Sequence, residues 1–197
     1  MKSFLPEIVC LLLIGLLSGN CGFEPSASTQ QKATVEAEMA DLTTIEARAE
    51  FLNTIYESDQ RARNEHSAAT QQFGYQSPQD LEAVAVLQET DRINRERIQA
   101  YLKQFPYPDL QQMGDAAAAA PWLVIHHSPS VEFRRTYLDT LYRAYQNGNI
   151  QQNGWTLFLK RLDEMVNREM LIMEGRYKPE DELTELYRRL RMEGYDL

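Results

Sequence analysis

Residues that could do chemistry gather first around position 60. Asp59, Arg63 and His66 are spaced four and three apart, so a helix would place all three on one face. A carboxylate in such a group can orient a guanidinium or an imidazole, and the group can then bind an anion or assist a proton transfer. The alternative is a solvated ion pair between Asp59 and Arg63, which would stabilise the helix by only about 0.3 kcal/mol.

A second polar cluster comprises Asp91, Asn94 and Arg95. The neighbouring charges Arg92 and Glu96 are typical of an ordinary solvated helix face, which is the stronger interpretation of this segment. Asp91 and Asn94 remain candidate ligand-binding residues, together with Gln60 beside Asp59 and His126 in a later segment.

His126 and His127 end an apolar stretch and differ by about 100° in direction if the segment is a helix. Only one of them is then expected to face inward. A buried histidine that bonds a backbone carbonyl is the commoner arrangement, and a catalytic or metal-binding role is the alternative. A metal needs at least three protein ligands, and no His-Glu-x-x-His or comparable spacing is present. We therefore expect no metal. On the alternative interpretation, His127 is a candidate catalytic residue.

Asp163 is a fourth catalytic candidate after Asp59, Arg63 and His127. It can approach His127 only through tertiary folding, and its alternative role is as part of a charged helix face with Glu164. The sequence contains no Gly-rich phosphate loop, no nucleophile elbow and no cysteine nucleophile. No cofactor is expected.

Apolar residues spaced three and four apart predict that helices position these side chains. Ser77 and Pro78 provide a helix start, while Pro106 and Pro108 end the helix before them. Alternation of the kind found in strands is not evident, so the prediction is an all-α helical bundle of about five or six helices. The expected helices span residues 35 to about 66 (with a first part that could be separate), 78–105, 115–127, 129–146, 155–174 and 179–193.

The segment 115–127 has an alternative, because 122–127 could form a buried strand. Five alanines precede Pro121, and alanine has the highest intrinsic helix propensity. A helix with a kink at Pro121 is therefore preferred.

The amino terminus resembles a signal peptide. Lys2 precedes an unbroken apolar run over 8–17, which as a helix would rise only about 15 Å, roughly half of a bilayer's hydrocarbon core. Small residues precede Cys21, as in bacterial lipoprotein signals, so Cys21 is the expected lipidation site; ordinary cleavage near 26–28 is the alternative. The expected organisation is a signal peptide over 1–20, the lipid-attachment cysteine and a flexible linker over 21–33, and one helical domain over 34–197.

Charge and cysteine content narrow the class of protein further. The formal net charge is −9. Nucleic acids and anionic membrane surfaces select clusters of Lys and Arg, so we expect no nucleic-acid partner. Cys10 lies in the signal segment, which leaves the exported domain without a disulfide and dependent on a hydrophobic core. The expected location is the bacterial cell envelope, with the lipid on Cys21 as the membrane attachment; a secreted or periplasmic soluble protein is the alternative.

One set of short strings occurs in order along the chain: Ser58–Asn64, Asp91–Asn94, Phe105–Pro108, Gly114 and Ala120–His127. Together these strings resemble an uncharacterised bacterial family, domain of unknown function 6624. His127 matches the histidine of the family's Gln-His pair, with His126 in place of the glutamine, whereas Asp163 keeps the acid of a later Asp-Arg pair whose arginine is missing here. The family's tail, which resembles Tyr-Gly-Thr-Gln, has no counterpart after Gly175. The resemblance implies a family but no activity.

Two functional hypotheses follow. The first is a tethered binding or scaffold module in the cell envelope, whose partner is an envelope protein, a peptide, a glycan or a small ligand. The second is a small hydrolase-like or transferase-like enzyme with His127 as general base, Asp59 or Asp163 orienting it, and Arg63 holding an anionic group. The first is favoured narrowly, because no nucleophile is recognisable and the family's last polar motif is absent.

Overall fold

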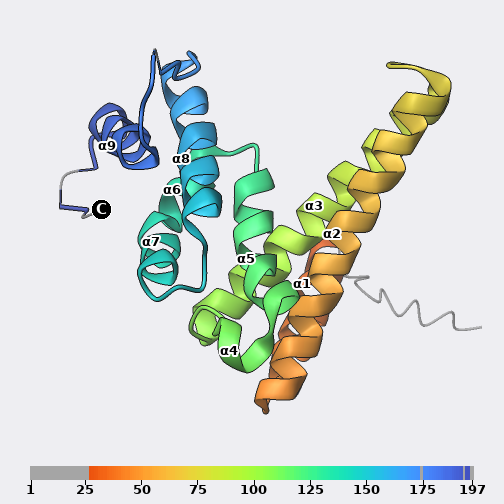
Figure 1. The fold of residues 1–197 in the computed structure, drawn as a ribbon. Helices are drawn as coiled ribbons and strands as arrows, with labels where there is room; N and C mark the ends of the chain where they lie inside the picture. The colour runs from red at the N-terminus through yellow and green to blue at the C-terminus, as the bar shows by residue number, and fades with distance from the viewer. Residues whose placement is uncertain (1–26, 174, 193, 196–197) are drawn as a thin grey trace, which may run out of the picture.

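A computed structural model describes residues 27–173, 175–192 and 194–195 of the chain (Figure 1). The described residues contain helices and no strand, which confirms the all-α prediction. The segment predicted to be a signal peptide and the predicted lipidation site Cys21 lie outside these residues. No helix among them is long and apolar enough to cross a membrane. The helices are α1 (Ala27–Asp41), α2 (Ile45–Phe73), α3 (Pro78–Gln104), α4 (Leu110–Met113), α5 (Asp115–His127), α6 (Val131–Thr136), α7 (Leu138–Gln146), α8 (Gln152–Asn167) and α9 (Pro179–Leu190).

The described chain has more helices than expected because two predicted segments are interrupted and because the short helix α4 was not predicted. The first expected helix divides into α1 and α2 at Thr44, whose hydroxyl accepts a hydrogen bond from the Ala47 amide and caps α2. The segment expected at 129–146 divides into α6 and α7 at Tyr137, where the backbone leaves the helical region. α1 begins at Ala27, inside the segment assigned to the linker, and α8 ends at Asn167 rather than near 174.

The long helices α2 and α3 form an antiparallel hairpin whose far end projects beyond the other helices (Figure 1). Ser77 caps α3 by accepting from the Asp80 amide, with Pro78 in the first turn, as predicted from the sequence. The turn between the helices needs a positive φ at Gly74 (+89°), which glycine adopts without strain.

Helix α5 lies at the centre of the molecule, between the hairpin on one side and α6 to α9 on the other (Figure 1). It packs against both α2 and α3. Pro121 is inside this helix, and the segment 122–127 is helical rather than extended. The turn that carries His126 and His127 therefore lies against the hairpin.

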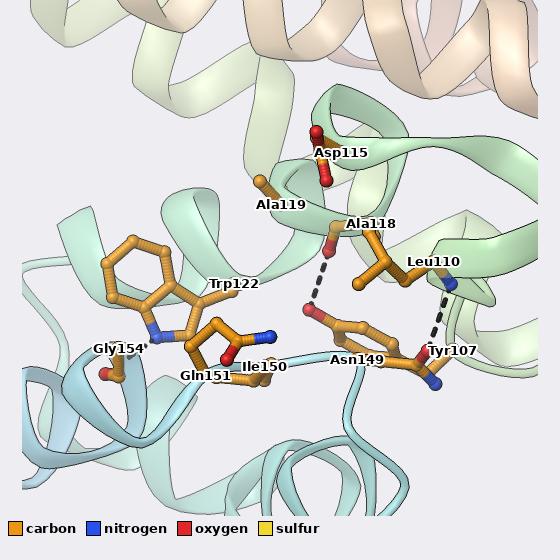
Figure 2. A pocket seen from close by; sticks show the side chains of 10 residues that line it. All are labelled: Tyr107, Leu110, Asp115, Ala118, Ala119, Trp122, Asn149, Ile150, Gln151 and Gly154. Carbon is orange, nitrogen blue, oxygen red and sulfur yellow. Dashed lines mark hydrogen bonds between the residues drawn. The ribbon is translucent and has the colours of Figure 1, made fainter.

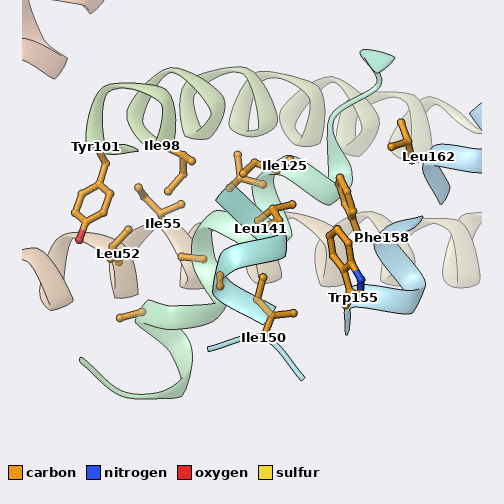
Figure 3. Packing of buried hydrophobic residues seen from close by; sticks show 14 of the residues in the cluster. Leu52, Ile55, Ile98, Tyr101, Ile125, Leu141, Ile150, Trp155, Phe158 and Leu162 are labelled. Carbon is orange, nitrogen blue, oxygen red and sulfur yellow. The ribbon is translucent and has the colours of Figure 1, made fainter. Parts of the chain in front are cut away.

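One hydrophobic core runs through both sides of α5 (Figure 3). Ile55, Ile98 and Ile125 join the hairpin to α5, and each is fully buried. On the other side Trp155 stacks between Tyr145 and Phe158, and its indole N–H donates to the Tyr187 hydroxyl at 2.8 Å. Burial of a large apolar side chain stabilises a fold by about 1.5–3 kcal/mol, so this core is the main source of stability for the described residues, which contain no cysteine.

Candidate functional site

Asp59, on α2, is the centre of a polar cluster between α2, α3 and α5. Its side chain is only 1% exposed, and both carboxylate oxygens accept hydrogen bonds. Arg63 donates from Nη2 to Oδ1 at 3.1 Å and from Nε to Oδ2 at 3.2 Å, and Gln60 donates to Oδ2 at 2.9 Å. The Nδ1 atom of His127 lies 3.1 Å from Oδ1. The structure thus brings together Asp59, Arg63 and His127 although His127 is on a different helix.

Asp91 joins the same cluster from α3. Its Oδ1 accepts from Nη2 of Arg63 at 2.7 Å, so one guanidinium bridges two carboxylates on neighbouring helices. These bonds use Nε and Nη2 of Arg63. The Nη1 atom has no hydrogen-bond partner within the described chain, and the side chain is 26% exposed.

The two carboxyl groups differ in their electrostatic environment. Burial alone would raise the pKa of Asp59, but hydrogen bonds from His127 and Arg63 outweigh burial and hold the pKa below its usual range. Burial raises the pKa of Asp91, an effect that Arg63 offsets only in part and that the charge of Asp59 reinforces. Asp59 is therefore a permanent anion at neutral pH, and Asp91 takes up a proton more readily.

The ionised carboxylate of Asp59 fixes the tautomer of His127. Only a protonated Nδ1 can donate to it, so Nε2 carries the lone pair in the neutral ring. The His127 side chain is 21% exposed, and Nε2 has no partner among the described residues. The Asp59 carboxylate, which Arg63 also contacts, therefore leaves the basic nitrogen of His127 available at the partly exposed side of the ring.

His126 faces the other way. Its ring stacks on Trp122, with ring centroids 4.9 Å apart and planes 11° from parallel. Burial lowers the pKa of His126 to about 3, and Arg134, His127, Arg161 and Arg63 add to the effect. The ring is neutral at physiological pH, and its buried Nδ1 has no partner in the described part of the structure.

Arg134 is a buried polar residue that no sequence pattern singled out. It is 2% exposed and donates from Nε to the Ser128 carbonyl at 2.8 Å and from Nη2 to the His126 carbonyl. Both acceptors lie at the carboxyl end of α5, where a cation interacts favourably with the helix dipole. Arg134 therefore positions the end of α5 that carries His127.

The remaining predicted site residues lie elsewhere. Asp163 contacts Arg189 and Asn167, at 2.9 and 2.6 Å, and not the Asp59 cluster. His66 lies 3.4 Å from the buried Asp80 near the tip of the hairpin. Asn94 is 2% exposed and exchanges hydrogen bonds with the Ser58 hydroxyl, which ties α3 to α2 beside the cluster.

The function of this site can be inferred only from its geometry, because no family model, curated protein or solved structure matches the chain. Within the described residues, no group of three or more His, Cys, Asp or Glu side chains is arranged to hold a metal ion. The arrangement of Asp59, Arg63, Asp91 and His127 is instead suited to binding a polar group and moving a proton.

Proposed function

We propose that this chain is an exported, lipid-anchored helical domain that binds a small ligand with an anionic group at the cluster of Asp59, Arg63, Asp91 and His127. The observation that supports this most directly is the pair of unpartnered nitrogens, Nη1 of Arg63 and Nε2 of His127, on half-buried side chains held by a buried carboxylate. Preorganised side chains of this kind bind with little loss of conformational entropy.

The protonation of His127 defines the class of ligand. Nη1 of Arg63 donates two hydrogen bonds, which suits a carboxylate or phosphate oxygen. Nε2 of neutral His127 accepts, so it matches an acidic O–H of the ligand, or it donates after taking up a proton. In both cases a proton is held between His127 and the ligand.

The test is a titration of the purified protein with inorganic phosphate and with acetate, followed by nuclear magnetic resonance of the histidine rings. We expect shifts of the His127 signals, and we expect Arg63→Gln and His127→Gln each to weaken binding by about tenfold or more. Glu96→Ala, on an exposed part of α3, is the matched control and should bind like the wild type. Equal binding by all four proteins would contradict the proposed site.

The anchor has a separate test. Acylation of Cys21 would hold the protein on a membrane, and the bacterial modification carries several acyl chains. Cys21→Ser should therefore move the protein from the membrane fraction to the soluble fraction. If the wild type does not partition into detergent, the anchor proposal is wrong while the ligand site remains testable.

A second candidate function is supported by the Asp59–His127 pair. A histidine whose Nδ1 donates to a buried carboxylate can remove a proton from water or a hydroxyl through Nε2, and the carboxylate stabilises the imidazolium that forms. In this enzyme, similar to a small hydrolase or transferase, Arg63 would hold an anionic substrate group. Asp163, bonded to Arg189, would have no part in it.

Binding and catalysis are distinguished by Asp59→Asn. The amide keeps the shape of the side chain but removes the charge that stabilises the imidazolium. For an enzyme acting on chromogenic esters and phosphoesters, we expect this variant to lower the turnover rate by about a hundredfold or more while ligand binding changes much less. Equal and small effects on both would favour the binding module.

A further inference from the structure

A pocket lies away from the Asp59 cluster, between the beginnings of α5 and α8 (Figure 2). Its volume is about 240 Å³. That equals the space of about eight water molecules at roughly 30 Å³ each, which is enough for one small ring and its substituents. The pocket is lined by Tyr107, Leu110, Asp115, Ala118, Ala119, Trp122, Asn149, Ile150, Gln151 and Gly154.

The walls of this pocket are held in place by hydrogen bonds of their own. The Trp122 indole N–H donates to the Gly154 carbonyl at 3.1 Å, and the Tyr107 hydroxyl donates to the Ala118 carbonyl at 2.8 Å (Figure 2). Both aromatic side chains thus use their polar atoms to fix their position, which leaves the rings as apolar wall. Space is tight at Gly154, because a Cβ there would lie 3.3 Å from Cγ2 of Ile150.

Three polar side chains at the pocket have unused hydrogen-bonding capacity. Asn149 accepts from the Leu110 amide through Oδ1 at 2.9 Å, which leaves both Nδ2 hydrogens free. The Asp115 carboxylate and the side-chain amide of Gln151, the residue just before α8, are exposed and make no hydrogen bond within the described chain. The pocket therefore offers donors and acceptors side by side. No Lys, Arg or His is among the described residues that line it.

We infer that this pocket binds one neutral, hydroxyl-rich ring, such as a single monosaccharide unit of a glycan. Each hydroxyl both donates and accepts, so it can satisfy an amide and a carboxylate together. An anionic group would face Asp115 with no cation among the described lining residues to balance it, and a purely apolar group would displace water from polar side chains without offering them a hydrogen bond in return. The C–H face of a sugar ring packs on the apolar wall formed by the tyrosine, the tryptophan and the alanines.

This inference goes beyond the proposed function, and the two sites can be tested separately. The pocket residues make no hydrogen bond with Asp59, Arg63, Asp91 or His127. Trp122 is the closest link between the two sites, since its ring stacks on His126. It also provides a fluorescent reporter of the pocket, whereas the other tryptophan, Trp155, is fully buried in the core.

The experiment is a titration of the purified full chain with methyl glycosides of glucose, galactose, mannose and N-acetylglucosamine, followed by tryptophan fluorescence and saturation-transfer nuclear magnetic resonance. Two variants test the pocket. Ala119→Leu fills it with a residue of high helix propensity at a half-buried position. Gln151→Ala removes an amide that makes no bond within the described residues, and Gln111→Ala, on the exposed face of α4, is its matched control.

We expect saturable binding of at least one glycoside, lost in Ala119→Leu, weakened by about tenfold in Gln151→Ala and unchanged in Gln111→Ala. His127→Gln should leave this binding unchanged, which separates it from the proposed function. The inference is overturned if no glycoside binds to the wild type, or if both pocket variants bind the glycosides as tightly as the wild type does. It is also overturned if Ala119→Leu leaves glycoside binding unchanged and abolishes the binding of acetate, phosphate or N-acetyltryptophanamide, because the pocket would then accept an anionic or an apolar ligand.

Discussion

Two buried aspartates, Asp59 on α2 and Asp163 on α8, each contact an arginine, yet their surroundings differ. Asp59 accepts through both oxygens, and the residues that bond to it keep unpartnered nitrogens at the surface. Asp163 accepts through Oδ1 alone, from Asn167 and Arg189, while its buried Oδ2 has no partner among the described residues.

The arginines show the same contrast. Arg63 bridges two carboxylates and leaves Nη1 free, whereas Arg189 connects Asp163 to the Glu169 carbonyl at 3.0 Å. The second arrangement joins α8, α9 and the segment between them. An acid beside an arginine therefore does not by itself identify a site. Accessible hydrogen-bonding groups held by a buried partner are what distinguish the Asp59 cluster from a structural ion pair.

The largest expected effect is the loss of stability when either Asp59 or Asp163 is removed. Asp59→Ala leaves Arg63 and His127 without their common partner, and we expect the free energy of unfolding to fall by about 3 kcal/mol. Asp163→Ala should cost about 2 kcal/mol, because only one of its oxygens is bonded. Denaturant unfolding measures both, and Glu96→Ala should stay within about 0.5 kcal/mol of the wild type. A larger loss for Asp163→Ala would reverse the comparison.

A smaller effect separates the two arginine pairs in double-mutant cycles. Asp59 and Arg63 share two hydrogen bonds, so we expect a coupling free energy of about 2 kcal/mol between Asp59→Ala and Arg63→Ala. Asp163 and Arg189 share one bond, and their coupling should be about 1 kcal/mol. Additive effects in the first cycle would show that Asp59 and Arg63 act independently.

The sequence predicted much of this fold because its helix signals are local. The start of α3 at Ser77 and Pro78, its end before Pro106, and the full range of α5 agree with the structure. The break at Tyr137 and the early end of α8 at Asn167 were not predicted. Helix ends of this kind depend on tertiary contacts, as where Arg189 bonds the Glu169 carbonyl just beyond α8.

The candidate site shows the same limit. The spacing of Asp59 and Arg63 predicted their contact, because residues four apart meet on any helix. The same spacing argument predicted that His66 would join the cluster, but His66 instead contacts Asp80, which lies on the other helix of the hairpin. Asp91, whose sequence surroundings favoured a solvated face, reaches Arg63 only because α2 and α3 pack side by side. Long-range contacts of this kind leave no local signal.

The pH dependence of stability should distinguish Asp59 from an ordinary surface acid. Its folded pKa is lowered, so in acid the unfolded state binds more protons than the folded state, and stability falls as the pH falls through the folded pKa. At pH 7 we expect Asp59→Asn to be less stable than the wild type, and the difference should shrink as the pH falls below the unfolded pKa of about 3.9 and through the lower folded pKa. Urea unfolding at several pH values measures it, and a constant difference would show that the charge of Asp59 is not what stabilises the cluster.

The smallest effect is expected at Asp91, where the shift has the opposite sign. A raised folded pKa means that ionisation costs stability: the contribution is most favourable below the unfolded pKa and is lost as the pH rises through the folded pKa. Asp91→Asn removes this cost and keeps an oxygen that can accept from Nη2 of Arg63. We therefore expect a small change in stability at pH 7, in the stabilising direction. If Asp91→Asn is more stable than the wild type but binds the ligand more weakly or turns over more slowly, the charge of Asp91 is retained for function. A loss comparable to that of Asp59→Ala would instead make Asp91 an equal structural partner of Arg63.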